Sequence, residues 1–417
     1  MSRPSSGHIL IIGGGIVGIC TAYYLAQRGQ QVTILEQASS AQSASAGNAG
    51  IVALGRPPLP RPGLARQAAR WMVDDGSPLY IRPSLSPRLW NWFWNFHRAC
   101  NEPHVVHCTE VLAAMGRETN RCWREIIRDE SIACDFRPVG WLDVFRSEAG
   151  RRSVLEEAEF SARFGCEFET LSGDELRRDE PLFRPEVRGA VRYPESFSLD
   201  PAEFLTRLIQ RLARFPVAVR QETAVARLLV RNNCCHGVEL VSGELLTADA
   251  VVVAAGAWTT ALARSVGVHI PLQAGKGYHL DLVAPEPPLT TACVCNESYL
   301  AVTPLGHNLR LAGTLEFSGI NHVLRRRRLD MLLQAARKYL RNVDDRKVLS
   351  QWCGLRPCTA DGLPVIGWAP GLRSLLFATG HAKMGLTHGP ITGRLVSECI
   401  LDGETSLDIT PLRVDRF

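Results

Sequence analysis

The hydrophobic pattern near the start of the chain alternates between strand-like and helix-like segments. Residues 8–12 (HILII) form a short apolar run, which is typical of a parallel strand buried on both faces. Residues 16–28 (IVGICTAYYLAQR) predict a helix, and residues 32–35 (VTIL) predict a second strand. This order of strand, helix and strand predicts a parallel α/β unit.

The glycines between the first strand and the helix indicate a dinucleotide site. Gly13, Gly15 and Gly18 match G-x-G-x-x-G, in which the glycines allow a tight turn, a close pyrophosphate and close helix packing, respectively. Glu36 ends the second strand, where an acid can accept hydrogen bonds from both ribose hydroxyls of an adenosine. Residues 9–26 carry no charge, so a membrane span is the alternative. That alternative explains none of these spacings, and the glycines disfavour a spanning helix.

Three later segments fit a nucleotide-binding domain that continues along the chain. The small-residue stretch 37–53 predicts either a loop along a pyrophosphate and flavin or a flexible surface loop. Residues 248–263 predict a buried strand that runs into Ala-Ala-Gly at 254–256. Residues 374–403 predict a strand, a glycine-bearing loop and an amphipathic helix that starts near Pro390. Each segment alone is also compatible with an ordinary α/β core.

The middle of the chain predicts more helices and an antiparallel sheet. Charged helical patterns, short apolar runs separated by turns, and longer alternating strands follow one another there. We expect helices within 100–135, 150–180 and 325–343, a small sheet within 217–243, and strands at 276–283 and 307–317 that cover the flavin.

Residues 87–100 (PRLWNWFWNFHRAC) contain three tryptophans and two phenylalanines among basic residues. An interfacial helix that touches lipid or quinone has this composition. However, apolar residues occupy nearly every side of the helix, which is more typical of a buried element. We therefore expect a core helix and keep the interfacial helix as the alternative.

Composition and charge narrow the class of function. The 417 residues are 46% hydrophobic and 21% charged, which is typical of a soluble globular protein of two or three domains. A net charge of +5 is too small for a nucleic-acid-binding surface. The thirteen cysteines form no C-x-x-C motif, so we expect reduced thiols, no metal site and a cytoplasmic location. Only one G-x-G-x-x-G occurs, so electrons should come from a small reduced substrate and not from NADPH.

Eight motifs along the chain carry a resemblance to a known family. The chain resembles the FAD-dependent amine oxidoreductases of the D-amino-acid oxidase, glycine oxidase and sarcosine oxidase class, and most closely the bacterial D-amino acid dehydrogenases. The motifs are GGGIVG (13–18), SAGNAG (45–50), SPLYIRPSLSPRLWNW (77–92), SLDPAEF (198–204), VVVAAGAW (251–258), GKGYHLDL (275–282), GLRPCTADGLPVIG (354–367) and ATGHAKMGLTHGP (378–390).

The resemblance implies an α/β fold with an α+β substrate part. A Rossmann-like FAD-binding domain, built from residues 1–80, 186–265 and 350–417, is expected to interleave with a substrate domain. The substrate domain, residues 81–185 and 266–349, is expected to combine helices with an antiparallel sheet.

The resemblance also implies that FAD binds without a covalent link. Cys353 and Cys358 flank Arg356, but neither falls on the register of the flavin attachment in related sarcosine oxidases. The residues expected to contact the cofactor are Gly13, Gly15, Ile16, Val17, Gly18, Glu36, Gln37, Gly47, Asn48, Ala49, Gly50, Ile51, Val225, Ala255, Gly256, Trp258, Gly380, Lys383, Met384, Gly385 and Leu386.

Three residues are candidates for the chemistry at the substrate. In the resembled class the arginine of GLRP, here Arg356, holds the substrate carboxylate, and a guanidinium does so through two parallel hydrogen bonds. Tyr278 either donates to that carboxylate from the pocket wall or packs within the sheet. His381 invites a role as general base, but we favour cofactor contact or loop structure for it. Lys383 is expected to offset the charge of the reduced flavin.

The function implied by the resemblance is oxidative deamination of D-amino acids. Hydride passes from the substrate Cα to flavin N5, and the resulting imine hydrolyses to a 2-oxo acid and ammonia. Electrons are expected to reach a quinone or the respiratory chain, with peripheral contact to the inner membrane face as an open question. The alternatives are a dehydrogenase of D-proline or hydroxy-D-proline, an oxygen-using glycine or sarcosine-type oxidase, and a flavin-binding subunit that needs a partner.

Overall fold

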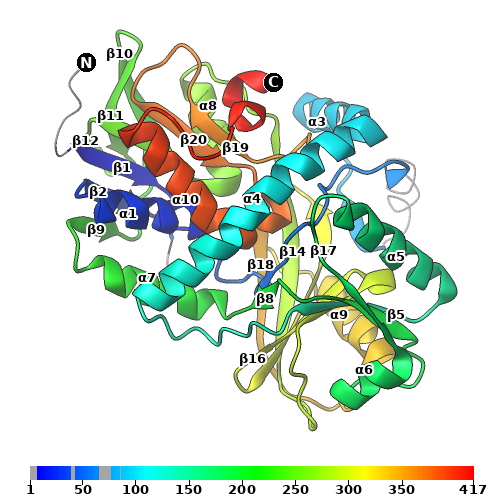
Figure 1. Cartoon of the computed structure of the whole chain (residues 1–417). Coiled ribbons are helices and arrows are strands. Elements are labelled where there is room, and N and C mark those ends of the chain that lie inside the picture. The colour runs from blue at the N-terminus through cyan, green and yellow to red at the C-terminus, as the bar shows by residue number, and fades with distance from the viewer. Residues whose placement is uncertain (1–6, 39–42, 65–76, 85) are drawn as a thin grey trace.

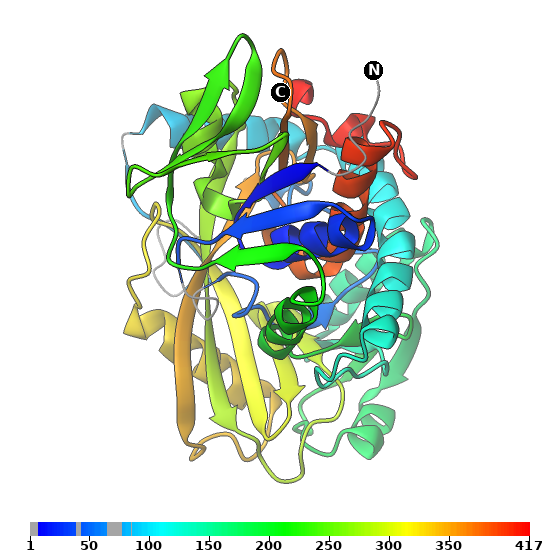
Figure 2. The ribbon, with the colours of Figure 1, turned by 90° about the vertical axis from the view of Figure 1, so that its left-hand side faces the viewer.

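The computed structural model describes residues 7–38, 43–64, 77–84 and 86–417 of the chain. Its described strands form a mostly parallel sheet, a large mixed sheet in which most strand pairs are antiparallel, and two small sheets (Figure 1). Figure 2 shows the large sheet below the parallel sheet, with a long helix along one side of both. The predicted α/β class is confirmed.

The parallel sheet has six strands in the order β19-β20-β13-β1-β2-β9. Side chains of β1 alternate between two hydrophobic clusters, because Ile9 and Ile11 face helices α1 and α10 while Leu10 and Ile12 face the opposite layer. The strand β19 alone runs antiparallel to its neighbour. The elements are β1 (His8–Ile12), β2 (Gln31–Leu35), β9 (Val217–Arg220), β13 (Ala250–Val253), β19 (Val365–Trp368), β20 (Leu375–Thr379), α1 (Ile16–Gln27) and α10 (Gly385–Leu401).

The large sheet follows the order β18-β14-β17-β16-β15-β5-β7-β6, with β4 beside β17. One face packs on helices α9 and α6 through an apolar cluster that includes Leu280, Leu300 and Leu332. The opposite face turns toward the parallel sheet. The strands are β4 (Leu79–Ile81), β5 (Trp141–Phe145), β6 (Glu169–Ser172), β7 (Gly189–Tyr193), β14 (Leu272–Val283), β15 (Cys293–Cys295), β16 (Leu300–Leu305), β17 (Asn308–Phe317) and β18 (Val348–Thr359).

The remaining elements cover the two sheets. The long helix α4 packs against α10. These elements are α3 (Pro87–Ala99), α4 (Glu102–Asp129), α5 (Glu148–Ala162), α6 (Gly173–Asp179), α7 (Pro201–Leu212), α8 (Thr259–Ser265), α9 (Arg326–Tyr339), the 3-10 turns η2 (Gly256–Trp258), η3 (Asn296–Ser298), η4 (Ala382–Met384), η5 (Thr410–Leu412) and η6 (Val414–Arg416), and the small-sheet strands β3 (Ile51–Val52), β8 (Phe197–Ser198), β10 (Val225–Arg231), β11 (Cys234–Leu240) and β12 (Leu245–Thr247).

Two strands pair differently from the expected division into domains. The strands β18 and β7 fall largely within the ranges 350–417 and 186–265, which we assigned to the FAD-binding domain, yet both join the large sheet. The ranges themselves stay a prediction, since strand pairing alone does not divide a chain into domains.

The predicted start of the C-terminal helix near Pro390 is wrong. Helix α10 begins at Gly385, so Pro390 lies inside it. Gly389 and Gly393 are one turn apart and face α1, where an added Cβ would meet Ile16 or the backbone of Cys20. The prediction placed Pro390 in the first helical turn, where proline is common, whereas close packing against α1 stabilises an additional turn before it.

The expectation that α3 is a core helix is wrong for half of its surface. Trp92 and Phe96 are buried and stack on each other, with ring centroids 5.1 Å apart. Trp90 and Trp94, on the opposite side, are 55% and 62% exposed. The helix is therefore amphipathic, with aromatic residues on both faces.

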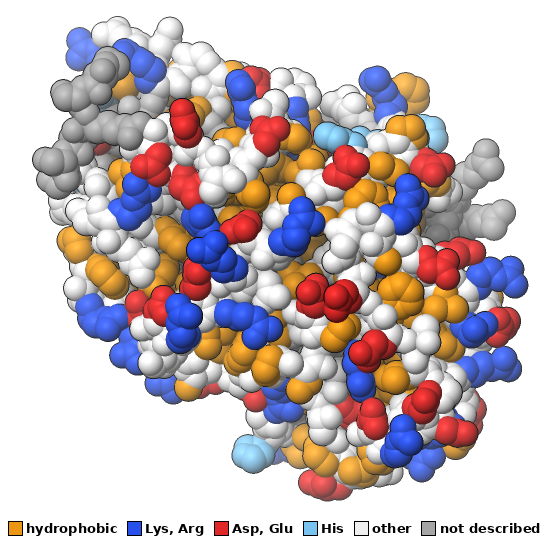
Figure 3. All heavy atoms as spheres, viewed as in Figure 1, with side chains coloured by type: hydrophobic (Ala, Val, Ile, Leu, Met, Phe, Trp, Pro, Cys, Tyr) orange, Lys and Arg blue, Asp and Glu red, His pale blue; other side chains and the backbone are white. Residues whose placement is uncertain are grey.

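On the face shown in Figure 3, acidic and basic side chains are interspersed over the molecule. This distribution agrees with the small net charge. Among the helices that the structure describes, none combines the length and the hydropathy that a bilayer span requires.

Candidate active site

A large cavity of about 1310 Å³ lies between the parallel sheet and the large sheet. Its walls come from the turn between β1 and α1, the segment from Ser43 to Ala53, the strands β14, β17 and β18, and the turns η2 and η4. Of the residues that the sequence predicts for cofactor and substrate, all line this cavity except Gly18, Gly50 and Gly380. Those three glycines lie behind the wall and bring backbone segments close together.

The turn after β1 has the geometry that the glycine motif predicts. Gly13 has a φ of +112°, and an added Cβ there would overlap the carbonyl of Ala254. An added Cβ at Gly18 would overlap the Gly13 carbonyl, so this glycine lets α1 start close to β1. Glu36 accepts hydrogen bonds from the amides of Gly14 at 2.7 Å and Ala38 at 3.0 Å. Its carboxylate therefore lies beside the turn, as an adenosine site requires.

The predicted small-residue loop is docked on the large sheet by residues that the sequence analysis missed. Arg310 donates to the carbonyls of Ala46 and Asn48, at 3.3 and 2.8 Å, and pairs with Asp281 at 2.8 and 3.0 Å. His279 donates from Nδ1 to the Gly47 carbonyl at 2.9 Å. Burial, together with the charge of Arg310, lowers the pKa of His279 to about 4, so the ring stays neutral. Asp281 and Arg310 face each other across β14 and β17, which only the strand register reveals.

The loop residue Ser45 covers the start of α1. Its hydroxyl accepts a hydrogen bond from the Ile16 amide at 3.0 Å. This amide belongs to the first turn of α1, where free N–H groups and the helix dipole favour an anion such as a pyrophosphate. The geometry of the motif, the acid beside it and this helix start together fit the nucleotide half of FAD.

Arg356 projects from β18 onto the cavity face of the large sheet. Its Nη1 donates to the carbonyl of Thr314 at 2.8 Å, and its guanidinium lies against Gly277, where an added Cβ would overlap it. The register between β14 and β17 shifts at this point, because Lys276 pairs with Glu316 and Tyr278 with Gly313. The resulting β-bulge turns the Thr314 carbonyl toward the guanidinium. Burial lowers the pKa of Arg356 without removing its charge at neutral pH.

Tyr278 lies on the other face of β14 from Arg356. Arg356 pairs with Gly275 and Cys353 pairs with Tyr278, so the alternation of a strand points the two side chains in opposite directions. The Tyr278 hydroxyl donates to Glu316 at 2.8 Å, and its ring is 1% exposed. Of the two alternatives for Tyr278, packing within the sheet is the one that the structure shows.

His381 is buried at the C-terminal end of β18 and β20. Its Nε2 is 2.9 Å from Oγ1 of Thr392, and its backbone forms a bridge with Cys358. Burial and the neighbouring His388 lower the pKa of His381 to about 3. A neutral ring held against Thr392 agrees with a role in loop structure rather than with a general base.

The comparisons with known proteins identify the family. Residues 8–399 match the DAO family model, described as FAD dependent oxidoreductase. The chain belongs to this family. A D-amino acid dehydrogenase of Methylobacterium nodulans is 34% identical over 94% of both chains, and one of Methylobacterium radiotolerans is 33% identical over 98% of this chain and 99% of the relative. The crystal structure of glycine oxidase from Bacillus cereus has a TM-score of 0.76 at 21% identity and covers 95% and 96% of the two chains.

As a member of the DAO family, the protein is an FAD-dependent oxidoreductase, which confirms the predicted cofactor and class of enzyme. Cys353 and Cys358 are both buried, and the Cys358 thiol contacts the carbonyl of Arg356. Among the described residues, no group of His, Cys, Asp and Glu side chains is arranged to hold a metal ion.

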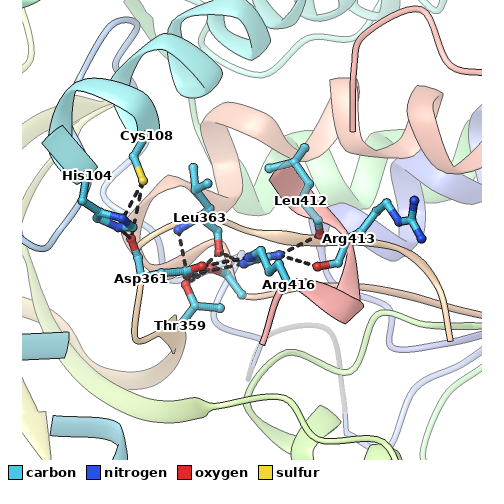
Figure 4. Close-up of polar contacts among 9 residues, drawn as sticks. His104, Cys108, Thr359, Asp361, Leu363, Leu412, Arg413 and Arg416 are labelled. Carbon is cyan, nitrogen blue, oxygen red and sulfur yellow. Dashed lines mark hydrogen bonds and ion pairs between the residues drawn. The ribbon is translucent and has the colours of Figure 1, made fainter. Parts of the chain in front are cut away.

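The loop between β18 and β19 in this DAO-family chain is fixed from two sides (Figure 4). From α4, His104 Nε2 lies 2.8 Å from the Asp361 carbonyl. From the C-terminal turn, Arg416 pairs with the Asp361 carboxylate at 2.8 Å and donates to the Leu363 carbonyl at 2.9 Å. Thr359 donates to Leu363 as well, at 2.8 Å. The C-terminal residues thus hold the loop that directly follows the strand of Arg356.

Proposed function

We propose that the protein is a dehydrogenase that oxidises D-amino acids. The observation that carries the proposal is the Arg356 guanidinium on the cavity floor. Within the described residues only its Nη1 has a hydrogen-bond partner, so Nε and Nη2 can form paired hydrogen bonds with a substrate carboxylate. The D-configuration of the substrate and the use of an electron acceptor other than oxygen are inferred from the two relatives at 33–34% identity, which are named D-amino acid dehydrogenases.

The residues of the chain would position the substrate, while bound FAD supplies the acceptor for two electrons. Arg356 holds the carboxylate and thereby orients the substrate within the cavity. The amine must be uncharged when it is oxidised, and solvent can remove its proton. His381 is buried against Thr392 and does not serve as the acceptor of that proton. The oxidised substrate is an imine, which water hydrolyses to a 2-oxo acid and ammonia.

FAD would bind without a covalent link, with its pyrophosphate at the first turn of α1 and Glu36 at the adenosine ribose. The start of α10 at Gly385 carries the positive end of a helix dipole and borders the cavity. This dipole would offset negative charge on the reduced flavin.

We also propose that α3 makes a peripheral contact with a membrane on the cytoplasmic side. Trp90 and Trp94 are exposed one turn apart, and the exposed Arg88 and Arg98 lie on the same helix. Aromatic side chains with neighbouring cations favour the headgroup region of an anionic bilayer. Cosedimentation with anionic vesicles should fall for the Trp90→Ser/Trp94→Ser variant. A quinone would then be the acceptor for the electrons.

Turnover with enantiomer pairs of alanine and proline, in the presence of an artificial electron acceptor, tests the proposal. We expect the D-enantiomers to reduce the acceptor and to produce little hydrogen peroxide in air. Peroxide formed in proportion to substrate would instead make the protein an oxidase. Exclusive turnover of D-proline would identify a cyclic imino acid as the substrate, and exclusive turnover of L-enantiomers would reverse the stereochemistry.

A further inference from the structure

A second group of charged side chains lies beside the same cavity at a distance from Arg356, and all of its members except Asp143 line the cavity. Arg56 pairs with Asp143 at 2.9 Å and with Glu157 at 2.6 Å, and Glu157 also pairs with Arg61. Lys383 lies next to this group and lines the cavity. We call Arg56, Arg61, Lys383, Asp143 and Glu157 the distal charged wall.

The distal charged wall carries an excess of positive charge toward the cavity. Its two carboxylates are enclosed, since the Asp143 side chain is 0% and that of Glu157 is 10% exposed. Arg61 is 36% exposed, and Lys383 is exposed on the cavity side. The two arginines balance the two acids, whereas Lys383 makes no ion pair with any described residue. A negative group in the cavity would therefore be attracted to Arg61 and Lys383.

The floor between Arg356 and the distal charged wall is made of small side chains. A row of paired residues crosses five neighbouring strands, from β14 to β5, with one residue from each strand. In order, these residues are His279, Ala312, Ala301, Val294 and Asp143. Partners in adjacent strands point to the same face, and alternation along β14 and β18 places Arg356 on that face too.

Arg356 and the distal charged wall lie at opposite ends of this row of residues. Three strand spacings, on the order of 14 Å in total, separate β17, which binds Arg356, from β5, which carries Asp143. Ala312, Ala301 and Val294 all border the cavity between them. The space thus suits an elongated molecule with an anionic group at each end.

We propose that the distal charged wall binds an acidic group of the substrate, so that the preferred substrates are D-amino acids whose side chain ends in a carboxylate. This inference rests on the proposed function, because it takes Arg356 as the site of the α-carboxylate. Arg61 offers a planar fork for the second carboxylate, and Lys383 offers a flexible point charge. The alternative is that the wall is purely structural and fixes the segment from Arg56 to Arg61 onto α5. Such an ion-pair network would need the two arginines and the two acids, but it would not need Lys383.

The test compares acidic substrates with neutral ones of the same shape. We would measure kcat/KM for D-glutamate against D-glutamine and for D-2-aminoadipate against D-norleucine, with an artificial electron acceptor. In the wild type we expect each acid to exceed its neutral partner by tenfold or more. In the Arg61→Gln variant this ratio should fall by about tenfold or more, since the second carboxylate loses a charge-assisted hydrogen bond. Arg121→Gln, on the exposed side of α4, is the matched control and should keep the ratio.

A binding measurement distinguishes loss of the carboxylate contact in Arg61→Gln from a change in turnover caused by misfolding of the variant. Glutarate and butyrate cannot be oxidised at Cα, and their dissociation constants can be read from changes in the flavin absorbance spectrum. Glutarate should bind the wild type more tightly than butyrate, and Arg61→Gln should remove that difference while the flavin spectrum of the variant stays normal. Equal acceptance of D-glutamate and D-glutamine by the wild type would overturn the inference and leave the proposed function intact. Failure of every D-amino acid to reduce the enzyme would overturn both.

Discussion

The guanidinium of Arg356 lies directly against Gly277, and an added Cβ at that glycine would overlap it. The absence of a side chain at position 277 and the carbonyl of Thr314 together determine where the charge of Arg356 lies. Both come from strands other than that of Arg356, so the position of the candidate carboxylate ligand depends on the register of three strands.

The Gly277→Ala variant should weaken substrate binding without loss of FAD. The methyl group would displace Arg356, and loss of its paired hydrogen bonds should raise the KM for a D-amino acid by about tenfold or more. Steady-state kinetics and the flavin absorbance spectrum measure the two effects. Gly116→Ala is the control, because its Cβ would meet only ordinary contacts at 3.8 Å and beyond. An unchanged KM in Gly277→Ala would show that Arg356 does not bind the substrate from this position.

The ion pair between Arg416 and Asp361 should contribute to stability. In Arg416→Ala the partly buried Asp361 loses its ion pair, which should lower the free energy of unfolding by about 1–3 kcal/mol. Arg413→Ala breaks an ion pair that is half exposed, so its effect should stay within about 0.5 kcal/mol. Urea denaturation of the FAD-loaded protein measures both. Similar losses of unfolding free energy in the two variants would mean that the ion pair of Arg416 with Asp361 stabilises the protein no more than an exposed one does.

Buried histidines should make the protein sensitive to mild acid. Burial lowers the pKa of His381 to about 3 and that of His388 to about 4, against an ordinary value of 6.5. The unfolded chain therefore binds protons below pH 6.5 that the folded chain does not bind, so stability is present above pH 6.5 and is lost as the pH falls. Each histidine should cost about 1.4 kcal/mol per pH unit in this range.

His388→Leu tests this dependence, because both ring nitrogens of His388 are buried with no hydrogen-bond partner among the described residues. The slope of unfolding free energy between pH 6.5 and pH 5 should be smaller in the variant than in the wild type. Equal slopes would show that His388 is protonated, or solvated, in the folded protein.

The preference for acidic substrates should depend on pH through Lys383. Enclosure of Lys383 by the cavity walls, followed by the charges of Arg56 and Arg61, lowers the pKa of Lys383 to about 7, while Glu157 and Asp143 oppose this shift. Lys383 is thus cationic below pH 7 and neutral above it. The ratio of kcat/KM for D-glutamate to that for D-glutamine should therefore fall as the pH rises from 6 to 8. A constant ratio would show that the charge of Lys383 does not reach the substrate.

Local patterns were sufficient to predict the geometry of the turn between β1 and α1 and the position of Glu36 beside it. The strand, the glycine turn, the helix and Glu36 follow one another within thirty residues, and their geometry follows from backbone sterics and spacing. The place of Arg356 at the cavity could be predicted from its motif, whereas its contacts with Gly277 and Thr314 could not.

Contacts that are determined by strand pairing could not be predicted from the sequence. The face of Tyr278 follows from its pairing with Cys353, and the ion pair of Asp281 with Arg310 follows from the register of β14 and β17. The distal charged wall joins Arg56 to Asp143 and Glu157, which are about a hundred positions away in sequence. Tertiary packing also determined the start of α10 and the exposed face of α3, where propensity and composition alone predicted otherwise.

Anaerobic reduction of the enzyme-bound flavin tests the central claim most directly. Wild type and Arg356→Lys would each be mixed with single D-amino acids and their L-enantiomers, and the loss of flavin absorbance would be followed in time. We expect D-amino acids to bleach the wild type. In Arg356→Lys, which keeps the charge but loses the fork, we expect the same initial spectrum and an apparent second-order rate of reduction lower by about a hundredfold. Equal rates of reduction in the two proteins, or no bleaching of the wild type by any D-amino acid, would contradict this account.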